Sequence, residues 1–174
     1  MADSAATLWL PAQALNCYEG NAELRSWLTH PGLLTERVRD VNRAAFALHV
    51  LREAPDGDEH VREIELCSGD QPWIVAQTRI PAETLVAQPW LRHIGGQSLG
   101  AALAQFYASS AMPVSRSEFG FAQLYDDRPL IAMALQRARL TPQALWTRRS
   151  TFSFQGPTLQ LLEVFLPVVG TLRS

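Results

Sequence analysis

The chain has few cysteines and no long apolar run. Its two cysteines, Cys17 and Cys67, are far apart, with no Cys-x-x-Cys spacing around either one. This argues against a disulfide scaffold. No segment approaches the roughly 18 consecutive apolar residues that span a bilayer, and the N-terminus lacks the basic and apolar regions of a signal peptide. We therefore expect a cytoplasmic protein with free thiols and no membrane insertion.

An excess of charge of either sign is also missing. The chain carries 15 basic and 17 acidic residues, with a formal net charge of -2 and a pI near 6.1. This balance gives no general attraction to nucleic acid, although a local cationic pocket could still bind a small anion. The four histidines are dispersed without metal-ligand spacing, and no nucleophile elbow or dinucleotide fingerprint occurs. We expect no metal and no cofactor.

What is present is the pattern of one globular domain. The 174 residues, 47% of them hydrophobic, suit a single domain over residues 1–174. Helical spacing is found in 21–28, where Asn21 caps the start, in 33–41, and from about Ser98. Six segments alternate as strands do. These segments are 44–53, 60–68, 71–81, 117–125, 144–155 and 158–167. We predict an α+β fold, an about six-stranded, mostly antiparallel sheet with helices covering one face.

One strand-like segment, "TLQLLEVFLP", carries a carboxylate in its middle. Counting by twos places Glu163 with Leu161 and Phe165 on one face, and the other face is also largely apolar. Burying an ionised carboxylate costs several kcal/mol unless a cation or several donors meet it. The sequence should therefore contain a partner for Glu163.

The segment "HVREIELCS" offers such a cation. Arg62 falls on the apolar face with Ile64 and Leu66, whereas Glu63 and Glu65 fall on the opposite face. Arg62 and Glu163 either form a buried structural ion pair or share a ligand, and the pattern does not decide between these alternatives. In "WTRRS", Arg148 is the inward arginine, and packing on Trp146 is favoured over ligand contact.

Two segments resemble a known family. The stretches "REIELCSGDQPWIVAQTRIP" and "LWTRRSTFSFQGPTLQLLEVFLP" are similar to chorismate pyruvate-lyase, also called chorismate lyase or 4-hydroxybenzoate synthase. The resemblance continues more weakly through "IGGQSLG" and "GLLTERV". It implies a lyase that converts chorismate to 4-hydroxybenzoate and pyruvate at the entry to ubiquinone biosynthesis, without cofactor or metal. Separately, we expect a monomer.

The resemblance also implies roles for single residues. The arginine that holds the product carboxylate falls on Arg62, and the glutamate that binds the hydroxyl falls on Glu163. These two are the expected catalytic residues. The residues whose main chain lines the ligand fall on Leu34 and Leu99.

The chain departs from the family pattern at one place. Where the family has a Gly-Arg pair, this chain has Ala76 and Gln77, so a second cation near the substrate is missing there. Arg79 is two residues on, on the same strand face as Gln77, and could replace it or could be a solvated arginine at a strand end. We expect both Gln77 and Arg79 near the substrate.

A second function is a ligand-binding protein without turnover, as in effector domains of some bacterial transcription regulators. Such a regulator should carry a basic helix-turn-helix module, and the six expected strands leave no room for one. The enzyme is therefore favoured. A variant that binds 4-hydroxybenzoate or a related aromatic acid, and turns over slowly because of Gln77, stays open.

Overall fold

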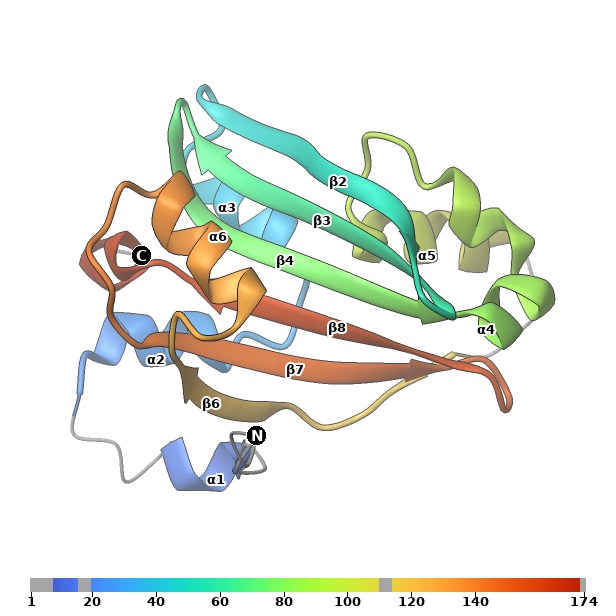
Figure 1. Cartoon of the computed structure of the whole chain (residues 1–174). Coiled ribbons are helices and arrows are strands. Elements are labelled where there is room, and N and C mark those ends of the chain that lie inside the picture. The colour runs from blue at the N-terminus through green and yellow to red at the C-terminus, as the bar shows by residue number, and fades with distance from the viewer. Residues whose placement is uncertain (1–7, 16–19, 110–113, 173–174) are drawn as a thin grey trace.

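A single antiparallel sheet organises the molecule (Figure 1). The computed structural model describes residues 8–15, 20–109 and 114–172, and within them eight strands pair in the order β1-β6-β7-β8-β4-β3-β2, with β5 beside β7. The strands are β1 (Leu10–Pro11), β2 (Phe46–Asp56), β3 (Glu59–Ser68), β4 (Gln71–Pro81), β5 (Ser115–Arg116), β6 (Gly120–Leu124), β7 (Leu145–Ser153) and β8 (Thr158–Phe165). Both halves of the chain therefore meet where β4 pairs with β8.

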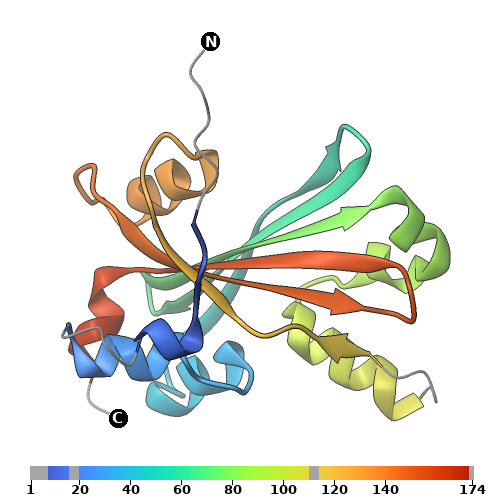
Figure 2. The same ribbon diagram turned by 90° about the horizontal axis from the view of Figure 1, so that it is seen from below.

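Helices lie on both sides of this sheet, as the view from below makes clear (Figure 2). The helical segments are α1 (Ala12–Leu15), α2 (Ala22–Leu28), α3 (Leu34–Val41), α4 (Ala82–Ala87), α5 (Leu99–Ser109), α6 (Pro129–Arg137) and two short 3-10 turns, Pro89–His93 and Pro167–Thr171. On one face, here called the inner face, lie α2, α3 and α5. On the other, the outer face, lies α6.

The main apolar core fills the space between the inner face and its helices. Trp27 and Leu28 of α2 are fully buried there, and Trp27 meets Trp73 edge to face at 6.1 Å. Truncating a side chain such as Leu28 to alanine would cost about 2 to 5 kcal/mol. A second, smaller core lies under α6, where Ile131 packs with Val164 and its neighbours.

The start of α2 is tied to the C-terminal turn by one side chain. Asn21 accepts hydrogen bonds from the backbone N–H groups of Glu23 at 2.9 Å and Leu24 at 3.1 Å, which is the expected N-cap. Its amide nitrogen also donates to the carbonyl of Gly170 at 2.6 Å. A Cβ at Gly170 would lie 2.9 Å from that nitrogen, so a larger residue there would displace the Asn21 amide.

The six predicted strands and the three predicted helices are confirmed in the described residues. Two elements of two residues each, β1 and β5, were not predicted because alternation needs more residues to be visible. The helix α6 was also missed, although Pro129 at its first position is a start signal and its apolar residues recur at helical spacing. The expectation that helices cover one face therefore holds for α2, α3 and α5, and α6 adds cover to the other.

The helices in the described part of the chain are all too short or too polar to cross a bilayer.

Candidate functional site

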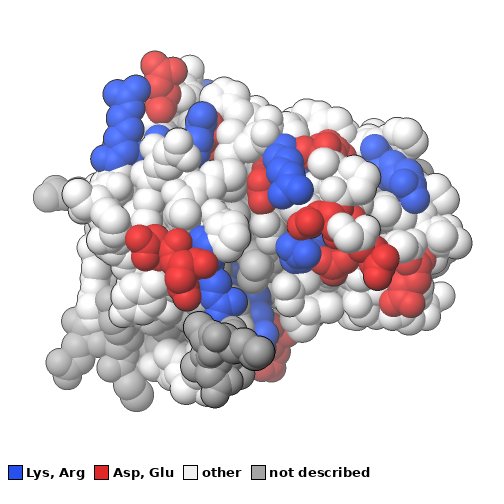
Figure 3. Space-filling model, viewed as in Figure 1, with Lys and Arg blue, Asp and Glu red and all other residues white. Residues whose placement is uncertain are grey.

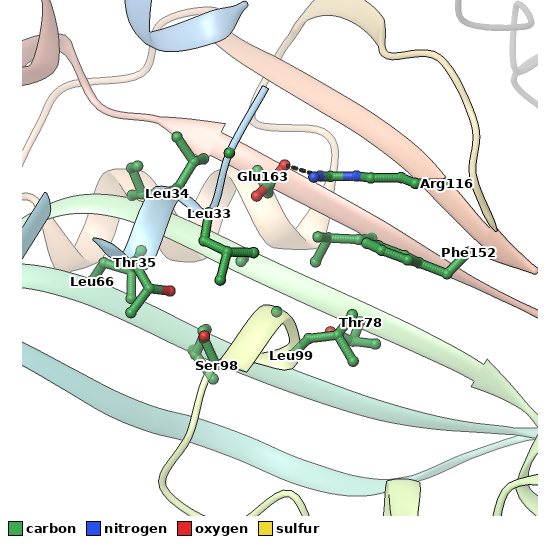
Figure 4. Close-up of a pocket in the computed structure, with 16 residues that line it drawn as sticks. Leu33, Leu34, Thr35, Leu66, Thr78, Ser98, Leu99, Arg116, Phe152 and Glu163 are labelled. Carbon is green, nitrogen blue, oxygen red and sulfur yellow. Dashed lines mark hydrogen bonds and ion pairs between the residues drawn. The ribbon is translucent and has the colours of Figure 1, made fainter. Parts of the chain in front are cut away.

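A pocket lies between the inner face of the sheet and the starts of α3 and α5 (Figure 4). Aliphatic side chains and Phe152 form most of its wall. The polar side chains that line it are Thr35, Thr78, Ser98, Arg116 and Glu163. A mostly apolar cavity with a few convergent polar groups is typical of a small-molecule site.

Glu163 is the carboxylate of this pocket. It lies on β8 and is 7% exposed, so its predicted burial is confirmed. Its Oε2 accepts a hydrogen bond from Arg148 Nε at 2.7 Å, and Arg116 Nη2 lies 3.4 Å from the same oxygen. The first cation comes from the opposing position of the neighbouring strand, because Arg148 and Glu163 are register partners of β7 and β8. Two arginines therefore balance the buried charge.

Arg148 anchors Glu163 and also the chain that leaves α2. It is fully buried, as predicted, and its Nη1 donates to the carbonyls of Leu28 at 3.1 Å and His30 at 2.8 Å. Its Nη2 has no hydrogen-bond partner in the described residues. The guanidinium lies 4.1 Å from the ring centre of Phe119. This cation–π contact offsets part of the cost of burying Nη2 without a hydrogen bond.

Arg116 is the pocket cation that the sequence did not reveal. Its Nε donates to Ser150 Oγ at 3.0 Å, and its guanidinium lies 4.5 Å from the ring centre of Phe119 and 5.0 Å from that of Phe152. Burial lowers the pKa of Arg116, and the charge of Glu163 opposes that shift. The residue lies in the two-residue strand β5, so no alternation could mark it as inward.

Arg62 faces inward on β3, as predicted, but does not touch Glu163. Its Nη2 donates to the carbonyls of Gly95 at 2.6 Å and Gln97 at 2.7 Å, and its Nε lies 3.5 Å from Glu53 Oε2. Burial lowers the pKa of Arg62, and Glu53 opposes the shift. The predicted alternative of an Arg62 and Glu163 ion pair is therefore wrong, because Arg62 instead fixes the loop before α5.

Leu34 and Leu99 both line the pocket, from the first residues of α3 and α5. Close to them, a Cβ at Gly100 would lie 2.3 Å from Leu33 Cδ2, so glycine allows the two helix starts to approach over the pocket (Figure 4). Gly100 itself, the second residue of α5, also lines the pocket.

Gln77 and Arg79 are not brought to this pocket. Ala76 and Thr78 line it, so their neighbours on β4 point to the outer face. Gln77 Nε2 donates to Glu63 Oε1 at 2.7 Å, and Arg79 Nε donates to Glu59 Oε2 at 2.6 Å. The expectation of Arg79 as the second pocket cation is thus not met, since strand alternation places it on the other side of the sheet.

The described residues that line the pocket include one carboxylate, Glu163, and neither histidine nor cysteine. Because two arginines already hold that carboxylate, the pocket supplies no set of metal ligands. It can hold a molecule with a hydroxyl near Glu163 and an anionic group near Arg116, between apolar walls.

Comparisons with known proteins agree with the segments described above. The chorismate lyase family model matches residues 4–171. A "Probable chorismate pyruvate-lyase" from Coxiella burnetii is 32% identical over 177 residues, covering 92% of each chain. The "Chorismate pyruvate-lyase" of Erwinia tasmaniensis is 31% identical over 162 residues, covering 84% of this chain and 79% of that one.

Among solved structures, the C-terminal domain of the histidine utilization repressor from Pseudomonas syringae pv. tomato is similar at a TM-score of 0.47 and 11% identity, covering 71% of this chain and 92% of that one. The two sequence relatives share a higher identity with this chain than this solved structure does. With a family model matched over residues 4–171 and relatives above 30% identity along most of the chain, the protein belongs to the chorismate lyase family.

Proposed function

We propose that the protein is a chorismate pyruvate-lyase that converts chorismate to 4-hydroxybenzoate and pyruvate. The observation that carries the proposal is Glu163, a buried carboxylate between two arginines in the wall of an apolar pocket. Family membership supplies the substrate class. One finer part of the proposal, a place at the entry to ubiquinone biosynthesis, rests on the resemblance of the sequence segments. The proposed cytoplasmic location and the single domain over residues 1–174 rest on the composition and length described for the sequence, and we propose a monomer.

The proposed reaction is an elimination. The bond between the ring carbon and the enolpyruvyl ether oxygen breaks, the ring gives up one proton and becomes aromatic, and the departing enolpyruvate takes up one proton to become pyruvate. Aromatisation supplies the driving force, so the protein has to hold the dicarboxylate in a reactive conformer and stabilise the charge that develops as the bond breaks.

We assign the polar end of the pocket to the ring hydroxyl. Glu163 would accept its hydrogen bond, and the two arginines keep the carboxylate oriented for it. Arg116 lines the same pocket and would place a positive charge beside the departing enolpyruvyl carboxylate. It takes the role that the sequence had suggested for Arg79.

We assign the ring carboxylate to Arg62 and the ring faces to Leu34 and Leu99. Arg62 and Glu163 lie on β3 and β8, which flank β4, and their register partners on β4 are Thr78 and Ala76. Two strand spacings and a two-residue offset separate their Cα atoms by about 12 Å, which leaves room for one ring between the two side chains. The described residues that line the pocket do not include Arg62. Its hydrogen bonds described above come from Nη2, and we assign its other N–H groups to a ligand carboxylate.

The test is to mix purified protein with chorismate and to measure both products over time. We expect pyruvate, followed by a coupled lactate dehydrogenase assay, and 4-hydroxybenzoate, followed by liquid chromatography, to appear in equal amounts. Tight binding of 4-hydroxybenzoate with no pyruvate above the uncatalysed rate would reject the enzyme in favour of the binding protein. Pyruvate together with a different aromatic acid would reject the assigned product.

A further inference from the structure

Three side chains with metal-ligating atoms meet on the outer face of the sheet, away from the pocket. His49 on β2 and Glu65 on β3 are register partners, and Cys67 lies two residues further along β3 on the same face. His49 Nδ1 is 3.0 Å from Glu65 Oε1 and 3.9 Å from Cys67 Sγ. One ligand atom from each of the three residues lies within 4.8 Å of the others.

These spacings suit a tetrahedral metal site. Zinc binds histidine nitrogen and carboxylate oxygen at about 2.0 to 2.2 Å and thiolate sulfur at about 2.3 Å, which places two such ligands roughly 3.4 to 3.6 Å apart. The observed separations of 3.0 and 3.9 Å bracket that range, so small side-chain rotations suffice. Histidine, thiolate and one carboxylate are the ligands of zinc and similar cations, whereas magnesium and calcium prefer oxygen alone.

The surroundings of the three residues favour a site that is held in place and open on one side. Glu65 and Cys67 are each 1% exposed, whereas the side chain of His49 is 51% exposed. Arg137 at the end of α6 donates from Nε to Glu65 Oε2 at 2.9 Å and from Nη2 to Oε1. Such an outer contact orients a ligating carboxylate. Oε1 keeps a second lone pair for a metal.

The distribution of charged side chains on the outer face is compatible with binding of a small cation. Figure 3 shows arginines and carboxylates interleaved on it, without a large area of one sign. Arg137 is the cation in direct contact with the group, and Glu65 balances it.

We propose that His49, Glu65 and Cys67 bind one zinc-class divalent cation, with water in the fourth position at the exposed side. On coordination the metal replaces the thiol proton of Cys67, and the proton passes to the buffer. The site differs from the expectation of no metal, which rested on spacing along the chain. His49 and Glu65 are 16 residues apart, and only the pairing of β2 with β3 brings them together.

The test uses the full chain without a purification tag, stripped with a chelator and desalted under a thiol-free reductant. Zn²⁺ is titrated in competition with a chromophoric zinc indicator, and we expect one ion bound per chain. Co²⁺ should give the near-ultraviolet absorption of a thiolate ligand. An excess of Mg²⁺ should not displace either ion.

Variants identify the ligands. His49→Ala changes an exposed ring and should keep the fold, with zinc affinity at least about tenfold lower. Cys67→Ser should abolish the near-ultraviolet band of the cobalt form. The matched controls replace another histidine and the other cysteine of the chain. His93→Ala and Cys17→Ser should bind zinc as the wild type does.

Absence of stoichiometric zinc binding in the wild type would overturn the proposal, and so would unchanged affinity in His49→Ala. A cobalt band that survives in Cys67→Ser, or is lost in Cys17→Ser, would overturn it as well. Circular dichroism of each variant checks that it is folded. Because no chorismate is used, failure here leaves the proposed lyase function untouched.

Discussion

The inner and outer faces of the same sheet use their charged side chains differently. On the inner face, Arg62 and Arg148 are almost completely buried and donate to loop carbonyls beside the pocket. On the outer face, Glu63 and Glu65 bind the side chains of Gln77 and Arg137. The inner arginines therefore position the loops that enclose a cavity, whereas the outer carboxylates join the sheet to itself and to α6. Burial alone does not distinguish a site, since Glu163 and Glu63 are both 7% exposed.

The largest expected effect separates these two glutamates. Glu163→Ala should reduce turnover of chorismate by at least about a hundredfold, because the pocket loses the polar group that we assign to the ring hydroxyl. Glu63→Ala, equally buried on the opposite face, should leave turnover unchanged. Steady-state kinetics on both variants make the comparison, with Glu163→Gln as a variant of the same shape. Full turnover in Glu163→Ala would remove that residue from the site.

The next effect concerns stability and uses neighbouring arginines of β7. Arg148→Met should lower the free energy of unfolding by about 3 to 5 kcal/mol, because Glu163 loses the cation hydrogen-bonded to it and two backbone carbonyls lose a donor. Arg149 is exposed and contacts the ring of Trp9, so Arg149→Met should cost about 1 kcal/mol or less. Urea unfolding measures both. Equal costs would contradict the assignment of Arg148 as the inner anchor.

A smaller effect tests the ligand role of Arg62. Arg62→Lys keeps the charge but loses the planar fork, so 4-hydroxybenzoate should bind roughly tenfold to a hundredfold more weakly. 4-Hydroxybenzamide, which lacks the anionic carboxylate, should respond much less. Calorimetric titration compares the two ligands, and Arg79→Lys on the outer face is the matched control. If Arg62→Lys lowers only the melting temperature, Arg62 acts through its hydrogen bonds to the loop.

The pH dependence of stability should reveal the outer pair of Glu65 and Arg137. Burial would raise the pKa of Glu65, but hydrogen bonds from Arg137 and His49 outweigh it and lower that pKa below 4.5. The contribution of this pair to the free energy of unfolding is thus complete above pH 4.5. It is lost as the pH falls through the lowered pKa of Glu65 in the folded state. Because the Arg137 side chain is 48% exposed, Arg137→Ala should cost at most about 1 kcal/mol at neutral pH. A cost that persists in acid would contradict this account.

No effect at all is expected from chelation on turnover. The pocket has charged side chains of its own, Arg116 and Glu163, so protein treated with EDTA and dialysed should act on chorismate at an unchanged rate. Activity that falls with EDTA and returns with a divalent ion would mean that chemistry depends on a metal. This measurement also separates the pocket from the proposed zinc site of the outer face.

Much of the fold could be predicted because long strands carry their own signal. The alternation along β3 predicts Arg62 inward and Glu65 outward, and the structure agrees, since Arg62 binds the loop before α5 and Glu65 binds Arg137 of α6. On β4, the same alternation places Gln77 and Arg79 on the face opposite to Thr78. The expectation that they contact the substrate came from the family resemblance and conflicts with this alternation. Leu34 and Leu99 came from the resemblance as well, and both line the cavity.

The sequence by itself determined the long elements, the inward placement of Glu163, Arg62 and Arg148, and the family. Its signals are local, since strand alternation and helix caps involve residues a few positions apart. Only the tertiary structure decided the partners of these charges: Arg148 and Arg116 for Glu163, loop carbonyls for Arg62, and His49 beside Glu65 and Cys67. The physical reason is that a cation and its carboxylate meet through strand pairing and loop closure, and neither is encoded by spacing along the chain.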